Sequence, residues 1–174
     1  MFPEFKDLKR LERLVKICDY SKVNRSLLLA VLLIDDNDTH EYFGHKYNIS
    51  NDLKEDLNFF AKNLKLIKKD KDFLNKNLEK NIYLFNKNNL IKLNILNFVI
   101  NPIIKLKDCT DILSKILKSK THKLNIDGKY LIENGMQQGS QVGEALKKIE
   151  EEWIKNNFKI NKEQVNEIIR LHSN

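Results

Sequence analysis

Two short pairs of carboxylates have the residue type and the spacing that a metal-dependent reaction needs. Asp36 with Asp38 and Asp70 with Asp72 both have the form D-x-D, and carboxylate oxygens are the ligands that Mg²⁺ prefers. A site of this kind also requires a rigid strand and a phosphate-binding loop, and the neighbouring residues predict neither. Because Asp is favoured at helix ends, we assign both pairs to helix capping and solvated loops and predict no catalytic residue.

The histidines and cysteines lack the spacing of a metal site or of a catalytic nucleophile. His40 and His45 are five residues apart, whereas the H-E-x-x-H pattern places two ligands on one helix face. We therefore expect each of them on the surface, or in the core with its polar atoms satisfied. Cys18 and Cys109 form no C-x-x-C pair and are expected to be buried, reduced thiols. His122 lies among lysines, and one histidine does not define a phosphate site.

Lysines are concentrated between residues 105 and 123, where few acidic residues compensate them. A segment of this composition can face the phosphates of a nucleic acid. The simpler alternative is a solvated helix face followed by a linker. Under the first alternative, the candidate RNA-binding lysines are Lys105, Lys107, Lys115, Lys118, Lys120 and Lys123.

Glycines are concentrated further along, since four of the five lie between residues 128 and 143. Gly135 is placed to end a short helix over 129–134 in the left-handed conformation, and Ser140 to cap the next helix. Gly143 falls in the first turn of that helix, where glycine costs about 1 kcal/mol relative to alanine. We therefore expect another helix or a phosphate close to Gly143. The first-turn amides add Ser140 and Gly143 to the RNA-binding candidates.

The elements that must position these residues are expected to be helices. Five glycines and two prolines leave little turn chemistry for a sheet, whereas apolar residues recur at spacings of three and four along the chain. The sequence therefore predicts an all-α fold. The expected helices cover 4–18, 27–34, 51–67, 70–79, 80–86, 88–101, a segment from about 108, 129–134, a segment containing 142–153 and a segment from 161.

Two parts are expected, a multi-helix body over 1–123 and a small helical tail over 124–174. In the tail, Trp153 falls on the apolar stripe of a helix and is expected to anchor a core. Asn161 followed by Gln164 is a capping-box pattern that begins the last helix. The last two helices, joined by a short loop, are expected to form a hairpin.

The composition is that of a folded chain with a basic balance. Of its 174 residues, 41% are hydrophobic, which is too many for a disordered chain. The net charge of +7 permits a polyanionic partner. The longest apolar run, 27–34, is far shorter than the ~20 residues that span a bilayer. We therefore expect a cytoplasmic protein without a membrane segment, with this run at the centre of the body.

The tail resembles a known family. The stretch "YLIENGMQQGSQVGEALKKIEEEWIKNNFKINKEQV" is similar to the C-terminal segment of bacterial class II tRNA nucleotidyltransferases, the CCA-adding enzymes and their poly(A) polymerase relatives. Weaker similarity lies upstream, in "FPEFKDLKRLERL", "RSLLLAVLL" and "YNISNDLKEDL". Lys129 and Gln138 depart from the family pattern, which has an acidic residue and a proline there. The residues that fill the family's places are Gly128, Leu131, Gly135, Gly139, Val142, Gly143, Leu146 and Trp153.

The resemblance implies the body and tail of such an enzyme, an all-α arm that holds the acceptor stem and T-arm of tRNA through the backbone. The family's α/β catalytic head, with its Gly-rich turn and D-x-D pair, has no counterpart among these residues. The implied function is therefore tRNA binding for 3′-end nucleotide addition. Catalysis, Mg²⁺ and CTP or ATP would belong to a head domain acting in cis or in trans, and no cofactor is expected in this chain.

Two other functions remain open. One is a stand-alone helical scaffold, with Val142, Leu146 and Trp153 partly exposed as a stripe that docks a protein. The other is DNA binding through the glycine loop of the tail, with helix amides on duplex phosphates. Binding to a nucleic acid should weaken steeply with salt, whereas hydrophobic docking should not.

Overall fold

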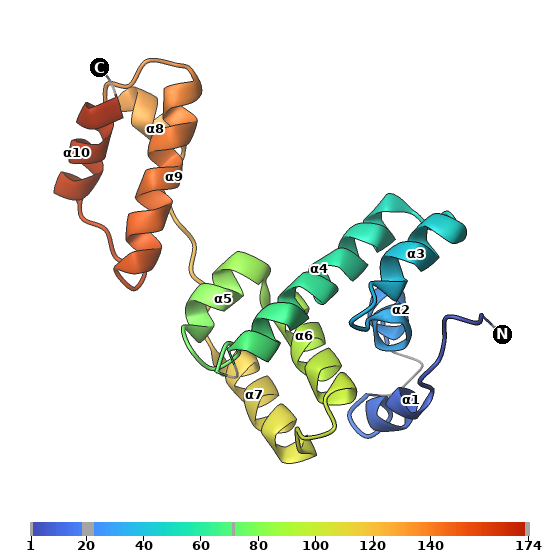
Figure 1. Cartoon of the computed structure of the whole chain (residues 1–174). Coiled ribbons are helices and arrows are strands. Elements are labelled where there is room, and N and C mark those ends of the chain that lie inside the picture. Colours follow the sequence, from blue (N-terminus) through green and yellow to red (C-terminus); the bar gives the residue numbers. More distant parts are fainter. Residues whose placement is uncertain (1, 19–22, 71, 173–174) are drawn as a thin grey trace. The chain divides into compact units, whose positions relative to one another are not determined.

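The computed structural model describes residues 2–18, 23–70 and 72–172, and within these ranges the regular elements are helices without a strand. The predicted all-α fold is thereby confirmed. The chain forms two compact units, Met1–Lys120 and Thr121–Asn174. The first unit contains α1 (Lys9–Leu14), α2 (Arg25–Leu33), α3 (Thr39–Lys46), α4 (Asn51–Lys69), α5 (Leu78–Phe85), α6 (Lys87–Ile100) and α7 (Leu106–Lys118), which run from blue to yellow in Figure 1.

Helix α6 lies at the centre of the first unit. It contacts α1, α2, α4, α5 and α7, and Leu90, Leu93 and Leu96 on it are fully buried. The polar Asn94 is also buried, and its side-chain amide donates to the carbonyl of Cys109 at 2.9 Å. This hydrogen bond joins α6 to α7 and satisfies a group that would otherwise be costly to bury.

Three segments differ from the sequence-based expectation. Helix α1 covers Lys9–Leu14 instead of 4–18, because the chain before it turns to bury Glu4. The predicted helix 70–79 is wrong, since residues 72–77 form turns and α5 begins at Leu78. Helix α3 was not predicted, because this short helix buries only His40, Phe43 and Gly44 and so shows no clear apolar stripe.

The buried Glu4 carboxylate ties the N-terminal segment to α3. It accepts hydrogen bonds from Lys46 Nζ at 2.9 Å and from the Tyr47 hydroxyl at 3.2 Å. The Tyr47 ring in turn packs against the rings of Phe2 and Phe43. Burial alone would raise the pKa of the Glu4 carboxyl. The hydrogen bonds from Lys46 and Tyr47 outweigh burial and lower the pKa below its ordinary value.

Glu4→Gln is expected to destabilise the chain in a pH-dependent way. Because the folded pKa lies below the unfolded one, the ionised Glu4 stabilises the fold above pH 4.5, the ordinary value, and this contribution is lost as pH falls through the folded pKa. The difference in unfolding free energy between Glu4→Gln and the unaltered chain should therefore narrow on going from pH 7 to pH 3 in denaturant titrations. The exposed Glu55→Gln on α4 is the control; an equal narrowing there would contradict the assignment.

The second unit is a three-helix tail of α8 (Gly128–Glu133), α9 (Ser140–Lys155) and α10 (Lys162–His172). Helix α9 contacts both of the others. Asp127 caps α8 by accepting from the backbone N–H of Tyr130 at 2.9 Å. The buried core of this unit consists of Leu131, Met136, Ala145, Ile149, Val165, Ile168 and Ile169.

The predicted capping box of the last helix is confirmed. The Asn161 side chain accepts from the backbone N–H of Gln164 at 2.8 Å, and the Gln164 side chain accepts from that of Asn161 at 3.1 Å. Asn161→Ala removes one arm of this pair and should lower the unfolding free energy of the second unit by about 1 kcal/mol. The fluorescence of Trp153, the only tryptophan, follows this unit during denaturation.

Asn166→Ala makes the same substitution at an exposed position within α10 and serves as the control. Alanine is the better helix former there, so this variant should be as stable as the unaltered chain or slightly more stable. A loss at Asn166 equal to that at Asn161 would show that the capping box does not account for the effect.

Among the helices that the structure describes, we find none that combines the length and the apolar character needed to cross a bilayer.

Candidate nucleic-acid interface

The positive charge of the chain belongs to the first unit. Met1–Lys120 contains 23 Lys and Arg against 16 Asp and Glu, a net charge of +7, whereas Thr121–Asn174 contains 8 of each and is neutral. Within the first unit the imbalance is greatest from residue 80 to residue 120, which has eight lysines and two aspartates. Attraction of a polyanion is therefore expected at the first unit, and most strongly along α6 and α7.

Three of the predicted lysines share one side of α7. Lys107, Lys115 and Lys118 lie within roughly 80° of one another around the helix axis, as the spacings of eight and three residues require. All three are exposed, and the opposite side of the helix buries Cys109 and Ile116. This burial fixes the orientation of α7, so the three ammonium groups face solvent.

A fourth lysine joins them from α6. Lys87 Nζ donates to the carbonyl of Leu117 at 3.2 Å, which places it beside the last turn of α7, where Lys115 and Lys118 lie. Lysine is favourable at this position because the carbonyl end of a helix is partially negative. Lys87, Lys107, Lys115 and Lys118 are hereafter called the lysine surface.

Lys87 was not among the predicted lysines, because its contact with α7 depends on the packing of α6 against α7. The signal that could have found it is the absence of any acidic residue between Lys80 and Lys107.

Two polar side chains, those of Asn75 and Asp111, moderate the positive charge of the lysine surface. Lys115 Nζ donates to the Asn75 side chain at 3.0 Å, and Asp111 falls on the same side of α7 as the lysines.

The other lysines of the first unit that were predicted from sequence flank α7. Lys105 is the N-cap residue, and its backbone N–H donates to the Asp108 carboxylate at 3.2 Å. Lys120 follows the helix, and both side chains are exposed. They extend the positive edge beyond the two ends of α7.

The remaining candidates, Lys123, Ser140 and Gly143, belong to the second unit and are exposed. The predicted capping role of Ser140 is wrong, because it is the first residue of α9 and Gly139 occupies the N-cap position. Among the described residues, an added Cβ at Gly143 would meet nothing within 4 Å. Of the two expected neighbours, the helix is therefore not found, and the phosphate stays a prediction. The left-handed conformation predicted for Gly135 is confirmed by its φ of 103°.

The residues of the apolar stripe in the tail pack within the second unit. Trp153 is buried, and its ring packs edge-on against that of Phe158 with centroids 4.9 Å apart. Val142 and Leu146 pack against the core of the second unit. The docking-stripe interpretation expected all three residues to be partly exposed, which holds for Val142 and Leu146 and is wrong for Trp153. Trp153 is buried, as expected of a core anchor.

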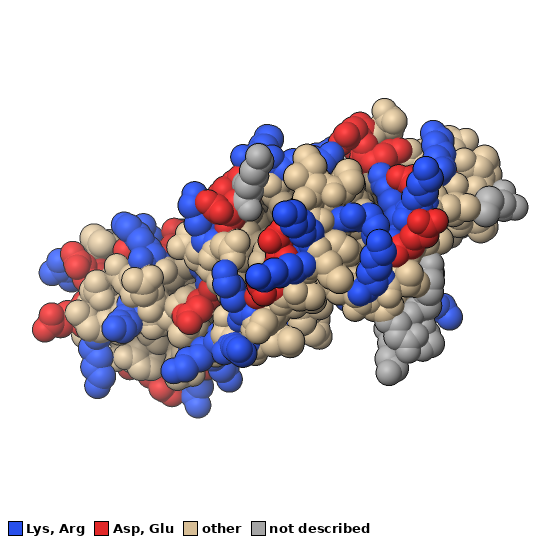
Figure 2. All heavy atoms as spheres, turned by 90° about the horizontal axis from the view of Figure 1, so that it is seen from below, with Lys and Arg blue, Asp and Glu red and all other residues tan. Residues whose placement is uncertain are grey.

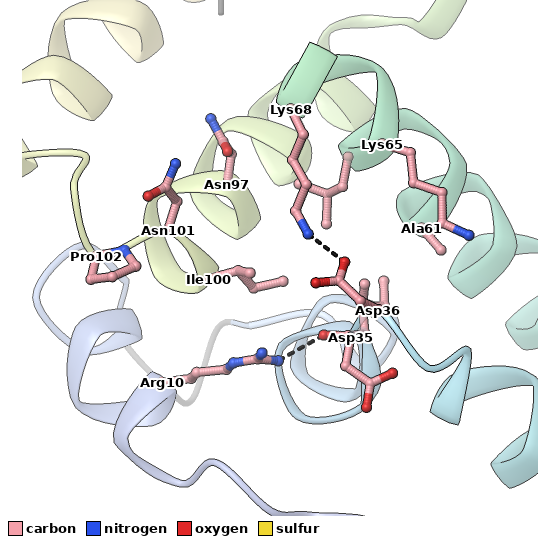
Figure 3. Close-up of a pocket in the computed structure, with 12 residues that line it drawn as sticks. Arg10, Asp35, Asp36, Ala61, Lys65, Lys68, Asn97, Ile100, Asn101 and Pro102 are labelled. Atoms are coloured by element: carbon pink, nitrogen blue, oxygen red, sulfur yellow. Dashed lines mark hydrogen bonds and ion pairs between the residues drawn. The ribbon is translucent and has the colours of Figure 1, made fainter.

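A cavity of about 370 Å³, lined by both apolar and charged side chains, lies between α1, α4 and α6 (Figure 3). Arg10 enters it from α1 and donates to the carbonyl of Ile34 at 2.7 Å. On the other side, Lys68 of α4 points to Asp36, 2.5 Å away. Lys65 also lines the cavity, and pairs with Asp38 at 3.1 Å. A phosphate here would have to break one of these contacts, so the cavity is a weaker anion site than the lysine surface.

The cysteines, His40 and His45 differ in burial and in the state of their reactive atoms. Cys109 is buried, and burial raises the pKa of its thiol to about 12, so it stays protonated at neutral pH. Cys18 is only half-buried, which differs from the expectation of two buried thiols. His45 is exposed, as expected of a surface histidine. His40 is buried with an unpaired Nδ1, which contradicts the expectation of a satisfied side chain.

Figure 2 shows that Lys and Arg are interspersed with Asp and Glu and with uncharged surface on the face it presents. Phosphate binding would therefore depend on individual lysines at particular positions, since a mixed surface does not give a broad field of one sign.

Comparisons with models of protein families, with curated proteins and with solved structures find no match to this chain. The resemblance of the tail to tRNA nucleotidyltransferases accordingly rests on its own residues alone.

Proposed function

We propose that this chain is a cytoplasmic RNA-binding protein whose first unit holds the phosphate backbone of tRNA through the lysine surface. The observation that carries the proposal is the placement of four ammonium groups around α7, within a segment of eight lysines and two aspartates. Each lysine that neutralises a phosphate releases condensed counterions, which supplies a large part of the affinity.

In this proposal the lysine surface recognises the positions of RNA phosphates and does not distinguish base sequences. Lys107 and Lys118 are eleven residues apart, which corresponds to roughly 16 Å along the helix axis. A rigid helix of this length can meet several phosphates of one strand. Lysine contacts to phosphate carry no sequence information, so recognition would depend on the shape of the RNA. The resemblance of the tail supports tRNA as the RNA to test first.

In this proposal the chain positions the RNA, and nucleotide addition would be performed by a catalytic head in cis or in trans. Lys123 and the first-turn amides at Ser140 and Gly143 would add contacts from the second unit. This unit is electrically neutral, so its contribution to affinity should be smaller than that of the lysine surface.

Binding of three RNAs to the full chain tests the proposal. Fluorescence anisotropy would compare full-length tRNA, a minihelix that lacks the T-arm, and a random duplex of equal length at two salt concentrations. The proposal predicts that full-length tRNA binds most tightly and that raising the salt weakens all three. Equal affinity for tRNA and the random duplex would contradict tRNA as the partner while leaving general RNA binding in place.

A protein-docking scaffold is the second candidate, supported by exposed apolar residues near α7. Ile103 is 85% exposed and Leu117 is 63% exposed, and large apolar side chains at such exposure can contact a partner protein. Hydrophobic docking should be almost insensitive to salt, whereas phosphate binding should weaken steeply. The salt dependence therefore separates the two candidates.

A further inference from the structure

We infer that Asp38, His40 and Glu41 at the start of α3 form a binding site for one divalent transition-metal ion of the Zn²⁺ class. One ligand atom from each of the three side chains lies within 4.8 Å of those of the other two. Ligands on one tetrahedral Zn²⁺ lie roughly 3.3 Å apart, as bonds of about 2 Å require. Side-chain movements that shorten these separations by up to about 1.5 Å would therefore bring the three atoms onto one ion. The site does not depend on the proposed RNA binding.

His40 provides the observation that points to a ligand. Its side chain is 3% exposed, and among the residues that the structure describes its Nδ1 has no hydrogen-bond partner. A buried polar atom without a partner costs free energy. A metal ion would satisfy an imidazole nitrogen that lacks a partner on a ring beside two carboxylates, since neutral imidazole is a common metal ligand.

The two carboxylates are available because another residue caps the helix. Asp35 accepts from the backbone N–H of Thr39 at 3.1 Å and from its hydroxyl at 2.6 Å. Asp38, although it occupies the N-cap position, makes no capping hydrogen bond with its side chain. The carboxylates of Asp38 and Glu41 are exposed, so an ion from solvent can reach them.

The donor set selects the class of metal. One imidazole nitrogen and two carboxylate oxygens suit Zn²⁺ or Co²⁺ with water completing the coordination, whereas Mg²⁺ and Ca²⁺ prefer oxygen ligands alone. The positive end of the α3 dipole opposes a cation here, and the two carboxylates offset it.

Lys65 competes for the site, because its Nζ lies 3.1 Å from Asp38 Oδ1. The second oxygen of that carboxylate can bind a metal while the first stays with Lys65, but the ammonium group repels the ion. Removal of this charge should therefore strengthen metal binding, which a merely structural role of Asp38 would not predict.

Calorimetric titration of the chelator-treated full chain with Zn²⁺ tests the inference. The expected result for the unaltered chain is binding of one Zn²⁺ per chain. His40→Gln and the double variant Asp38→Asn/Glu41→Gln should bind Zn²⁺ at least about tenfold more weakly. Lys65→Gln should bind it severalfold more tightly. His45→Gln, on the same helix, should bind like the unaltered chain. Because His40 is buried, circular dichroism must first show that His40→Gln folds. If this variant does not fold, the loss of Zn²⁺ binding is judged from the double variant Asp38→Asn/Glu41→Gln, whose replaced side chains are exposed.

Three outcomes would overturn the inference. They are no Zn²⁺ binding by the unaltered chain, full retention of binding in Asp38→Asn/Glu41→Gln, or an equal loss of binding in His45→Gln. Co²⁺ gives a second readout, since ligation by His40 should produce visible absorption bands that the double variant loses.

Discussion

Replacing Arg13 with alanine is expected to lower the unfolding free energy of the first unit by about 3 kcal/mol. The Arg13 guanidinium donates to the carbonyls of Phe98, Asn101 and Ile104 at 2.5 to 3.1 Å. It also lies over the Phe98 ring, 4.3 Å from the centroid. These carbonyls belong to the end of α6 and the turn after it, which have few partners within the helix. Denaturant unfolding followed by circular dichroism measures the loss.

Two further variants separate this role from a general effect of charge. Arg13→Lys keeps the charge but lacks the planar fork of donors, so it should recover only part of the stability. Arg25→Ala removes an exposed arginine at the start of α2 and should change the unfolding free energy by less than about 0.5 kcal/mol. A loss in Arg13→Ala as small as that in Arg25→Ala would show that the fold does not depend on this contact.

Replacing all four residues of the lysine surface, Lys87, Lys107, Lys115 and Lys118, with glutamine is expected to weaken tRNA binding at least about 30-fold at low salt. Each lysine that contacts a phosphate contributes close to one unit to the slope of log K against log salt. Four such contacts should therefore lower the magnitude of the slope by about 3 to 4. Anisotropy titrations at several salt concentrations measure both quantities.

A matched variant removes four exposed lysines elsewhere, Lys9, Lys62, Lys69 and Lys147, and so changes the net charge equally. Under the proposal it should lose little affinity, because screening leaves distant exposed charges with a small effect. Equal loss in both variants would mean that tRNA responds to net charge alone and that α7 provides no particular binding surface.

Helices with a regular apolar stripe could be predicted from the sequence. Residues 51–67 carry Leu57, Phe60, Leu64 and Ile67 on one face, and all four are buried in α4. Helix α3 could not be predicted in this way, because its burial comes from contacts with α4 and with the N-terminal segment. The predicted helix 70–79 failed because local spacing does not show that Asn77 takes a left-handed φ of 50°, which interrupts the helix.

Of the lysine surface, the sequence predicted only the residues that lie on a single helix. Lys107, Lys115 and Lys118 lie on one side of α7, and helical spacing alone brings them together. Lys87 reaches them through the packing of α6 on α7, which no local pattern encodes. The open space beside Gly143 could not be predicted either. The sequence shows that this residue has no side chain, but tertiary packing decides which groups lie close to it.

The measurement that tests the central claim most directly is the salt dependence of tRNA binding by the unaltered chain. If the lysine surface holds phosphates, log K should fall linearly with log salt, with a slope of at least about 3 in magnitude. No binding at low salt, or binding with a slope near zero, would contradict the claim and favour the protein-docking scaffold.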